Sequence, residues 1–335
     1  MTVVTGFLGA GKTTLIRAAL AHPAAARTAV IVNEFAETGI DDVLLRTASQ
    51  DVTLIGNGCI CCAARSDLNR ALRALYADRE RGAVPPFDRV VVETSGVSEP
   101  APVLQNFATD RTVTSAYALE GLVTVVDSVL ASRTQAHAPI WSEQVALADR
   151  IVLTKADLLP PASAAATRAL VGALNPQAAI ADAADVREAP AFLFGAPGHE
   201  RTGFACTPQP ALPAGAPYVS FVLTFDAPFH WALFTRIMDA LAATRGEDLL
   251  RVKGLVNVEG CAGPVVVHHV QHLAAPPEEL SAWPATAGGA GRRTRLVFIT
   301  RGLSRQKVVA LFAAHLDLVA ADAARLDPDA AMRAG

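Results

Sequence analysis

The sequence predicts an α/β protein in which a mostly parallel sheet with crossover helices is followed by a smaller α+β domain. Three observations support this prediction. In the first half, Val- and Ile-rich runs alternate with amphipathic segments, as in parallel sheets that helices cover on both faces. The stretch 189–217 contains six prolines and four glycines, which block regular structure. A second series of strands and helices follows it.

The first domain is predicted over 1–188, and its strands are nearly continuous apolar runs. These strands are expected at Thr2–Thr5, Thr28–Asn33, Arg89–Glu93, Leu122–Asp127 and Arg150–Thr154, with a weaker one near Ala178–Ala181. Helices are expected at Thr14–Ala21, Ser66–Asp78 and Ser142–Ala148. In the second of these helices, Leu68, Leu72 and Leu75 recur at helical spacing.

The second domain is predicted over 218–320, after a linker over 189–217. Its strands are expected at Tyr218–Phe225, Leu250–Val258, Pro264–Val270 and Arg295–Thr300. Helices are expected at Phe229–Ala243 and Ser304–Leu316, where Ser304 is a suitable N-cap. This pattern is typical of a small α+β domain.

Composition excludes several classes of protein. The 335 residues include 29 Lys and Arg against 32 Asp and Glu, so the net charge is −3, which argues against binding to nucleic acid. No apolar run reaches the roughly 18 residues of a membrane span. Lys12 and Arg17 interrupt the apolar N-terminus, which therefore does not resemble an export signal. Five cysteines, three of them clustered, indicate metal binding in a reducing cytoplasm.

A phosphate-binding motif, G-x-x-x-x-G-K-[ST], occupies Gly6–Thr13 between a predicted strand and a predicted helix. Glycines let the backbone N–H groups turn inward around phosphate oxygens, and the helix N-terminus favours the negative charge. Lys12 is expected to reach the β- and γ-phosphates, and the Thr13 hydroxyl is expected to bind Mg²⁺. The nucleotide-binding residues predicted here are Gly6, Gly9, Ala10, Gly11, Lys12, Thr13 and Thr14.

Two later segments complete the predicted nucleotide site. Arg89–Glu93 is an apolar strand that ends in an acid, so Glu93 is expected to hold Mg²⁺ through water or to orient the attacking water, with Lys12 as the second catalytic residue. Gly96 follows at the position of a γ-phosphate-sensing glycine. Glu93 as an ordinary strand-end carboxylate is the alternative.

The base is predicted to be guanine. A strand over 150–154 leads into the segment Thr154–Asp157, which has the sequence T-K-x-D. Asp157 can accept hydrogen bonds from guanine N1 and N2, while the stem of Lys155 covers the ring. Adenine offers no such pair of donors, so the motif favours GTP over ATP.

Three cysteines, Cys59, Cys61 and Cys62, lie within four residues after the apolar stretch Val52–Ile55. Thiolates at this spacing can converge on one cation, and they suit Zn²⁺ best among the common metals. Buried free thiols or a redox pair are the alternatives. A fourth ligand is expected from water, substrate, Glu34 or Glu37.

With these motifs the sequence resembles the CobW branch of the CobW/UreG-like P-loop GTPases. The resemblance is carried by the segments GFLGAGKTT at 6–14, Asn33–Phe35, GCICC at 58–62, ETSG at 93–96, TKAD at 154–157 and RVKGL at 251–255. It implies a P-loop NTPase fold with a CobW-type C-terminal domain, and GTP hydrolysis coupled to delivery of zinc or cobalt to a client metalloprotein. Asn33 is predicted to belong to the nucleotide site, and Glu34 is predicted as a metal ligand.

The sequence departs from the family pattern at Ala36, where a glycine is usual, and at Val32, where many relatives carry an acid. It has no histidine-rich run. Its first strand begins only four residues before Gly6, which is expected if the natural chain starts upstream of Met1. Three histidines of the second domain are expected to have ordinary structural positions in its sheet and on its surface, or alternatively to form an auxiliary metal site: His268, His269 and His272. His230 and His315 are expected on helices, and Cys206 and Cys261 as isolated thiols.

The predicted function is therefore that of a cytoplasmic GTPase that uses GTP, Mg²⁺ and Zn²⁺ or Co²⁺. Its expected partner is a client protein, with no nucleic acid and no membrane, and a homodimer is left open. Two alternatives are a small-molecule P-loop kinase and a non-hydrolysing, nucleotide-stabilised activator of a metalloenzyme.

Overall fold

The computed structural model describes residues 1–32, 53–56, 67–194, 218–274, 276–283 and 292–326. The chain divides into two compact units, Met1–Ala211 and Leu212–Gly335. The short helix α10 (Ala191–Phe194) lies within the stretch predicted as a linker, and its Leu193 is buried in the core of the first unit. The domain limits at 188 and 217 remain a prediction.

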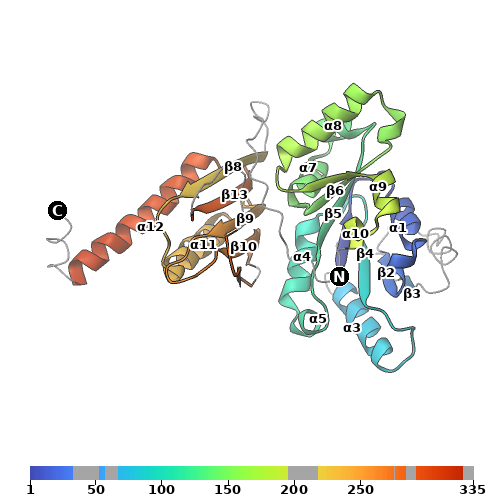
Figure 1. Ribbon diagram of the computed structural model, residues 1–335, viewed down its shortest axis with the longest axis horizontal. Helices are drawn as coiled ribbons and strands as arrows, with labels where there is room; N and C mark the ends of the chain where they lie inside the picture. The colour runs from blue at the N-terminus through green and yellow to red at the C-terminus, as the bar shows by residue number, and fades with distance from the viewer. Residues whose placement is uncertain (33–52, 57–66, 195–217, 275, 284–291, 327–335) are drawn as a thin grey trace. The chain divides into compact units, whose positions relative to one another are not determined.

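The first unit contains a seven-stranded sheet with the order β3-β2-β4-β1-β5-β6-β7, in which every pair of neighbours is parallel (Figure 1). Its strands are β1 (Thr2–Thr5), β2 (Thr28–Val32), β3 (Thr53–Gly56), β4 (Arg89–Glu93), β5 (Gly121–Asp127), β6 (Arg150–Thr154) and β7 (Ala179–Asp182). This sheet confirms the predicted fold class. β3, at the edge, was not predicted as a strand.

Helices lie on both faces of this sheet (Figure 1). They are α1 (Lys12–Leu20), α3 (Asp67–Glu80), α4 (Pro100–Thr109), α5 (Arg111–Ala116), α6 (Ala131–His137), α7 (Pro139–Leu147), α8 (Pro161–Leu174), α9 (Ala183–Glu188) and α10. On one face, α1, α9 and α10 pack on the central strands through Leu15, Val186 and Leu193. Burial of such side chains supplies most of the driving force for folding, at about 25 cal/mol per Å² of apolar surface.

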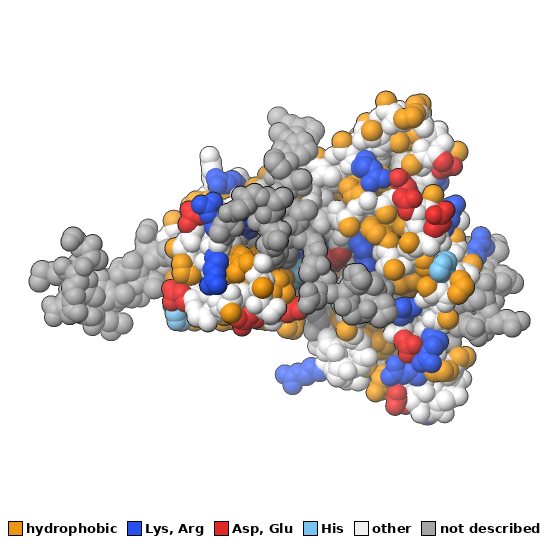
Figure 2. Space-filling model, in the orientation of Figure 1, with side chains coloured by type: hydrophobic (Ala, Val, Ile, Leu, Met, Phe, Trp, Pro, Cys, Tyr) orange, Lys and Arg blue, Asp and Glu red, His pale blue; other side chains and the backbone are white. Residues whose placement is uncertain are grey.

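The predicted helices of the first unit form, but several others were not predicted. α7 begins at Pro139 rather than at Ser142, because a proline is well tolerated at the first position of a helix. α8 is rich in alanine, so its apolar pattern is weak although alanine strongly favours helix. Figure 2 shows basic and acidic side chains interspersed on the visible surface of this unit.

The second unit is an antiparallel sheet with the order β11-β10-β9-β13-β8, and β12 pairs with β10. Its elements are β8 (Tyr218–Phe225), α11 (Trp231–Arg245), β9 (Arg251–Val256), β10 (Val265–Val270), β11 (Leu273–Ala274), β12 (Glu278–Glu279), β13 (Thr294–Arg301) and α12 (Arg305–Leu326). Phe221 and Phe298 stack at 5.2 Å on adjacent strands, and Phe234 of α11 and Phe312 of α12 join them in one core.

Two details of the second unit differ from the prediction. α12 continues to Leu326 instead of ending at Leu316, since the residues in between are mostly alanine and leucine with no glycine or proline. His230 was expected on a helix, but its backbone is extended and it stands at the N-cap of α11. The Ser304 hydroxyl accepts a hydrogen bond from the Lys307 N–H at 3.4 Å, which agrees with its predicted role as an N-cap. Among the described residues, no helix is both long and apolar enough to cross a bilayer.

Candidate functional site

The loop between β1 and α1 has the backbone that the phosphate-binding motif predicts. Gly6, Gly9 and Gly11 have φ angles of 141°, 72° and 88°, which L side chains rarely adopt. Gly6 also has no room for a side chain, because a Cβ there would lie 2.2 Å from the Val125 carbonyl oxygen of β5. The loop therefore requires glycine at these positions.

The carbonyl groups of this loop are held by donors from the protein itself. The contacts are Lys12 Nζ to the Gly6 carbonyl (2.9 Å), Thr154 Oγ1 to the Ala10 carbonyl (2.8 Å) and Lys155 Nζ to the Gly9 carbonyl (2.9 Å). Because a trans peptide directs its C=O and N–H to opposite sides, the N–H groups that follow these carbonyls are turned away from the donors. The Ala10 N–H closes a turn by donating to the Phe7 carbonyl at 3.1 Å, so Phe7 and Gly11 carry the N–H groups that this arrangement offers to an anion.

Glu93 is placed beside the P-loop. It ends β4, next to β1 in the sheet, and is only 2% exposed. Its Oε1 accepts a hydrogen bond from Thr13 Oγ1 at 2.7 Å, so the Thr13 proton is directed to the carboxylate. The lone pairs of the hydroxyl then remain for a hard cation, which fits the oxygen ligands that Mg²⁺ prefers.

The turn after β4 lies against the P-loop. Thr94 is tied to β1, since its N–H donates to the Val4 carbonyl and its hydroxyl to Thr5 Oγ1, both at 2.9 Å. A Cβ at Gly96 would lie 2.6 Å from the backbone nitrogen of Leu8. Gly96, which the sequence predicts to lie near the γ-phosphate, is therefore in close contact with the P-loop.

Lys155 follows β6 in a left-handed conformation, with φ at 57°. Its Nζ lies 2.5 Å from Asp127 Oδ2 and also reaches the P-loop carbonyl of Gly9. The other carboxylate oxygen, Oδ1, accepts the N–H groups of Val129 and Leu130 at 2.9 and 3.2 Å. Asp127 thus holds the side chain of Lys155, which in turn contacts the P-loop, and the sequence signals this role only by an acid at the end of a strand.

The structure brings the P-loop, Glu93, Gly96 and Lys155 together at the carboxyl ends of β1, β4 and β6. Asp157 is exposed on the next turn, Ala156–Leu158, and Thr14 is exposed in the first turn of α1. The remaining predicted site residues, Asn33, Glu34, Cys59, Cys61 and Cys62, lie outside the described residues.

Within the part of the chain that is described, no three His, Cys, Asp or Glu side chains form a group that could hold a metal ion. The histidines of the second unit therefore form no such site among themselves.

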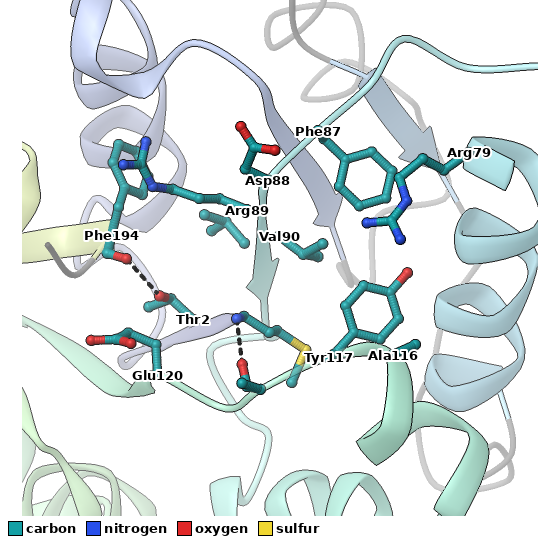
Figure 3. Close-up of a pocket in the computed structure, with 13 residues that line it drawn as sticks. Thr2, Arg79, Phe87, Asp88, Arg89, Val90, Ala116, Tyr117, Glu120 and Phe194 are labelled. Atoms are coloured by element: carbon teal, nitrogen blue, oxygen red, sulfur yellow. Dashed lines mark hydrogen bonds between the residues drawn. The ribbon is translucent and has the colours of Figure 1, made fainter. Parts of the chain in front are cut away.

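A separate cavity of about 510 Å³ opens at the amino ends of the central strands β1 and β4, opposite to their carboxyl ends where the P-loop lies (Figure 3). The Arg79 guanidinium lies 5.2 Å from the Phe87 ring centre. The Tyr117 hydroxyl donates to the Leu72 carbonyl at 2.9 Å, and burial raises the pKa of Tyr117 to about 12. These side chains are already engaged within the fold, and they lie at the other end of the strands from the P-loop.

A glycine loop between a strand and a helix, with a buried acid bonded to its hydroxyl residue, defines a P-loop nucleotide-binding protein. The chain belongs to the CobW/HypB/UreG family. Residues 1–182 match the model of its nucleotide-binding domain, and residues 218–316 match the cobalamin synthesis protein cobW C-terminal domain.

Similar proteins are known from bacteria and fungi. The zinc chaperone YjiA of Escherichia coli is 31% identical over 317 residues, which cover 93% of this chain and 97% of YjiA. The zinc chaperone CobW of Pseudomonas aeruginosa is 34% identical over 53% of this chain, but the match covers only 54% of that protein. A solved structure of zinc-bound YjiA GTPase superimposes with a TM-score of 0.72 at 30% identity, covering 93% of this chain and 97% of that one.

Proposed function

We propose that this protein is a cytoplasmic GTPase that binds a transition metal, zinc or alternatively cobalt, and delivers it to a client metalloprotein. The observation that carries the proposal is the similarity to a zinc chaperone along nearly the whole of both chains. The Thr13–Glu93 pair and the shape of the P-loop support nucleotide chemistry independently of that similarity.

The nucleotide would bind along the P-loop, with its phosphates against the backbone N–H groups that face away from the protein. Lys12 would leave the Gly6 carbonyl to contact the β- and γ-phosphates, and Asp157 with Lys155 would recognise guanine. Gly96, together with Asn33, would lie at the terminal phosphate. Glu93 would orient the attacking water or accept its proton.

Mg²⁺ fits the ligands on this side of the loop, because the Thr13 hydroxyl donates its hydrogen bond to Glu93 and keeps its lone pairs for the ion. These two side chains would hold the ion directly and through water. When bound, Mg²⁺ would neutralise charge on the phosphate oxygens.

The transition metal is a cargo rather than a resident cofactor. Cys59, Cys61 and Cys62 would bind it, with Glu34 as a further ligand. β3 ends at Gly56, three residues before Cys59. Because the sheet is parallel, the carboxyl end of β3 lies on the same side of the sheet as the carboxyl end of β1, where the P-loop begins. Nucleotide state and metal affinity would influence each other, and such coupling must be reciprocal.

The test compares zinc affinity with GDP and with a non-hydrolysable GTP analogue. We expect the two affinities to differ at least fivefold, and equal affinities would refute the coupling. Replacing Cys59, Cys61 and Cys62 together with serine should remove the bound zinc measured by elemental analysis, whereas the control Cys261→Ser should retain it.

GTP turnover is measured in the same preparations. Transfer of phosphate to a small acceptor without release of free phosphate would favour a kinase. Turnover at background level, with or without zinc, would favour a non-hydrolysing activator.

A further inference from the structure

Gln144 lies within α7 and is fully buried, yet its side chain reaches the turn that follows β4. Its Nε2 is 3.2 Å from the Gly96 carbonyl oxygen and 3.3 Å from that of Ser98. Only the NH₂ group of an amide can donate to two carbonyls, so Nε2 and not Oε1 of Gln144 must face the turn. Gln144 is therefore a side-chain anchor for a turn at the nucleotide site.

The anchored segment is a tight turn. The Ser98 N–H donates to the Ser95 carbonyl at 3.0 Å, which places Gly96 and Val97 at the centre of a β-turn. With the Gly96 carbonyl held toward α7, the N–H of the same peptide, which belongs to Val97, is directed away from α7. The direction of this backbone donor is thus set by Gln144.

The helix that carries Gln144 is itself fixed in place. The Gln144 backbone carbonyl accepts the hydroxyl of Thr124, on β5, at 2.6 Å. Asn175 Nδ2 shares its two hydrogens among three carbonyls at the end of α7, those of Val145 (2.8 Å), Ala146 (3.1 Å) and Ala148 (2.8 Å). The residues from Trp141 to Leu147 are all buried. The amide of Gln144 therefore comes from a firmly held element.

We propose that Gln144 is a positioning residue for the terminal phosphate of the nucleotide. By holding the Gly96 carbonyl, it directs the Val97 N–H away from α7, toward the γ-phosphate. This inference rests on the proposed function, which places the turn at that phosphate. Because GDP has no group there, Gln144 contributes to binding of the triphosphate and hardly to binding of the diphosphate.

The test is Gln144→Met, which keeps the length of the side chain and removes the donor. Dissociation constants are measured for GDP and for a non-hydrolysable GTP analogue, with kcat for GTP and the melting temperature. We expect about a tenfold weaker affinity for the analogue and a kcat at least about tenfold lower, since the loss is that of a buried hydrogen-bond donor. The affinity for GDP should stay within about twofold. Gln135→Met, on the neighbouring helix α6, is the matched control and should change none of these quantities.

A purely structural role would weaken both nucleotides equally, and that result would overturn the proposal. If Gln144→Met does not fold, Gln144→Asn is measured in its place. It keeps the amide but draws its nitrogen back by one methylene, so it should show the same selective loss. If the wild-type chain binds both nucleotides without hydrolysing GTP, the proposed function fails, whereas the ratio of the two affinities still tests Gln144.

Discussion

Thr13 and Glu93 are joined by a hydrogen bond of 2.7 Å between the threonine hydroxyl and the carboxylate, which links the first turn of α1 to the end of β4. Glu93 is buried, so a carboxylate at this position needs a partner, and Thr13 supplies one of its hydrogen bonds. The pair lies where a P-loop protein needs both a hydroxyl that binds the cation and a carboxylate that orients the attacking water.

The first prediction concerns Glu93→Gln, which keeps the shape of the side chain and removes its charge. We expect GTP hydrolysis to fall about a hundredfold, as for loss of a general base, with GDP affinity nearly unchanged. The measurement is phosphate release at saturating GTP across a Mg²⁺ titration. Glu99→Gln, at an exposed residue before α4, is the control. Unchanged turnover in Glu93→Gln would show that Glu93 is only a strand-end carboxylate.

The second prediction concerns the choice of base. Asp157→Ala removes the acceptor proposed for guanine N1 and N2, so GTP affinity should fall about tenfold to a hundredfold and the preference for GTP over ATP should shrink by the same factor. Competition between the two nucleotides measures this directly. Asp185→Ala, at an exposed position in α9, should leave the preference intact. An undiminished preference in Asp157→Ala would mean that other residues recognise the base.

The third prediction uses the close contact between Gly96 and the P-loop. In Gly96→Ala the new methyl group would meet the Leu8 backbone at 2.6–2.8 Å, and backbone atoms cannot move aside cheaply. We expect nucleotide affinity to fall at least about tenfold and the melting temperature to drop by several degrees, for a destabilisation of roughly 1–3 kcal/mol. Gly82→Ala, where φ is 67° but no atom lies within 4 Å, isolates the cost of backbone strain. Equal effects in both variants would contradict the role of the contact.

The fourth prediction concerns acid stability of the second unit. His269 is 7% exposed, and burial lowers its pKa from the ordinary 6.5, a shift that the nearby Asp239 partly opposes. Just below pH 6.5 the unfolded chain therefore takes up a proton that the folded chain does not, so the free energy of unfolding declines as the pH falls. This stability is fully present at neutral pH.

Denaturant unfolding between pH 7.5 and 5 checks this prediction. In His269→Gln the decline should be shallower than in the wild type, while His137→Gln, on the exposed end of α6, should keep it. An equal slope in wild type and His269→Gln would show that other groups cause the acid sensitivity.

The P-loop and the acid-ended strand could be predicted from the sequence because each depends on residues that lie close together in the chain. Gly6 to Thr13 form a continuous motif, and Glu93 ends an apolar run. The contacts of Asp127 with Lys155 and of Gln144 with Gly96 could not be predicted, because these partners lie 28 and 48 residues away and are chosen by packing. In α8, alanine favours helix but supplies no apolar stripe, so periodicity alone missed it.

The contacts that hold the P-loop carbonyls have a consequence for the way in which nucleotide binds. Lys155 and Thr154 hold the carbonyls of Gly9 and Ala10. The conformational entropy of the loop is therefore lost during folding rather than on nucleotide binding. Association should then be a single-step encounter, with a rate that increases linearly with nucleotide concentration and shows no plateau from a slow rearrangement.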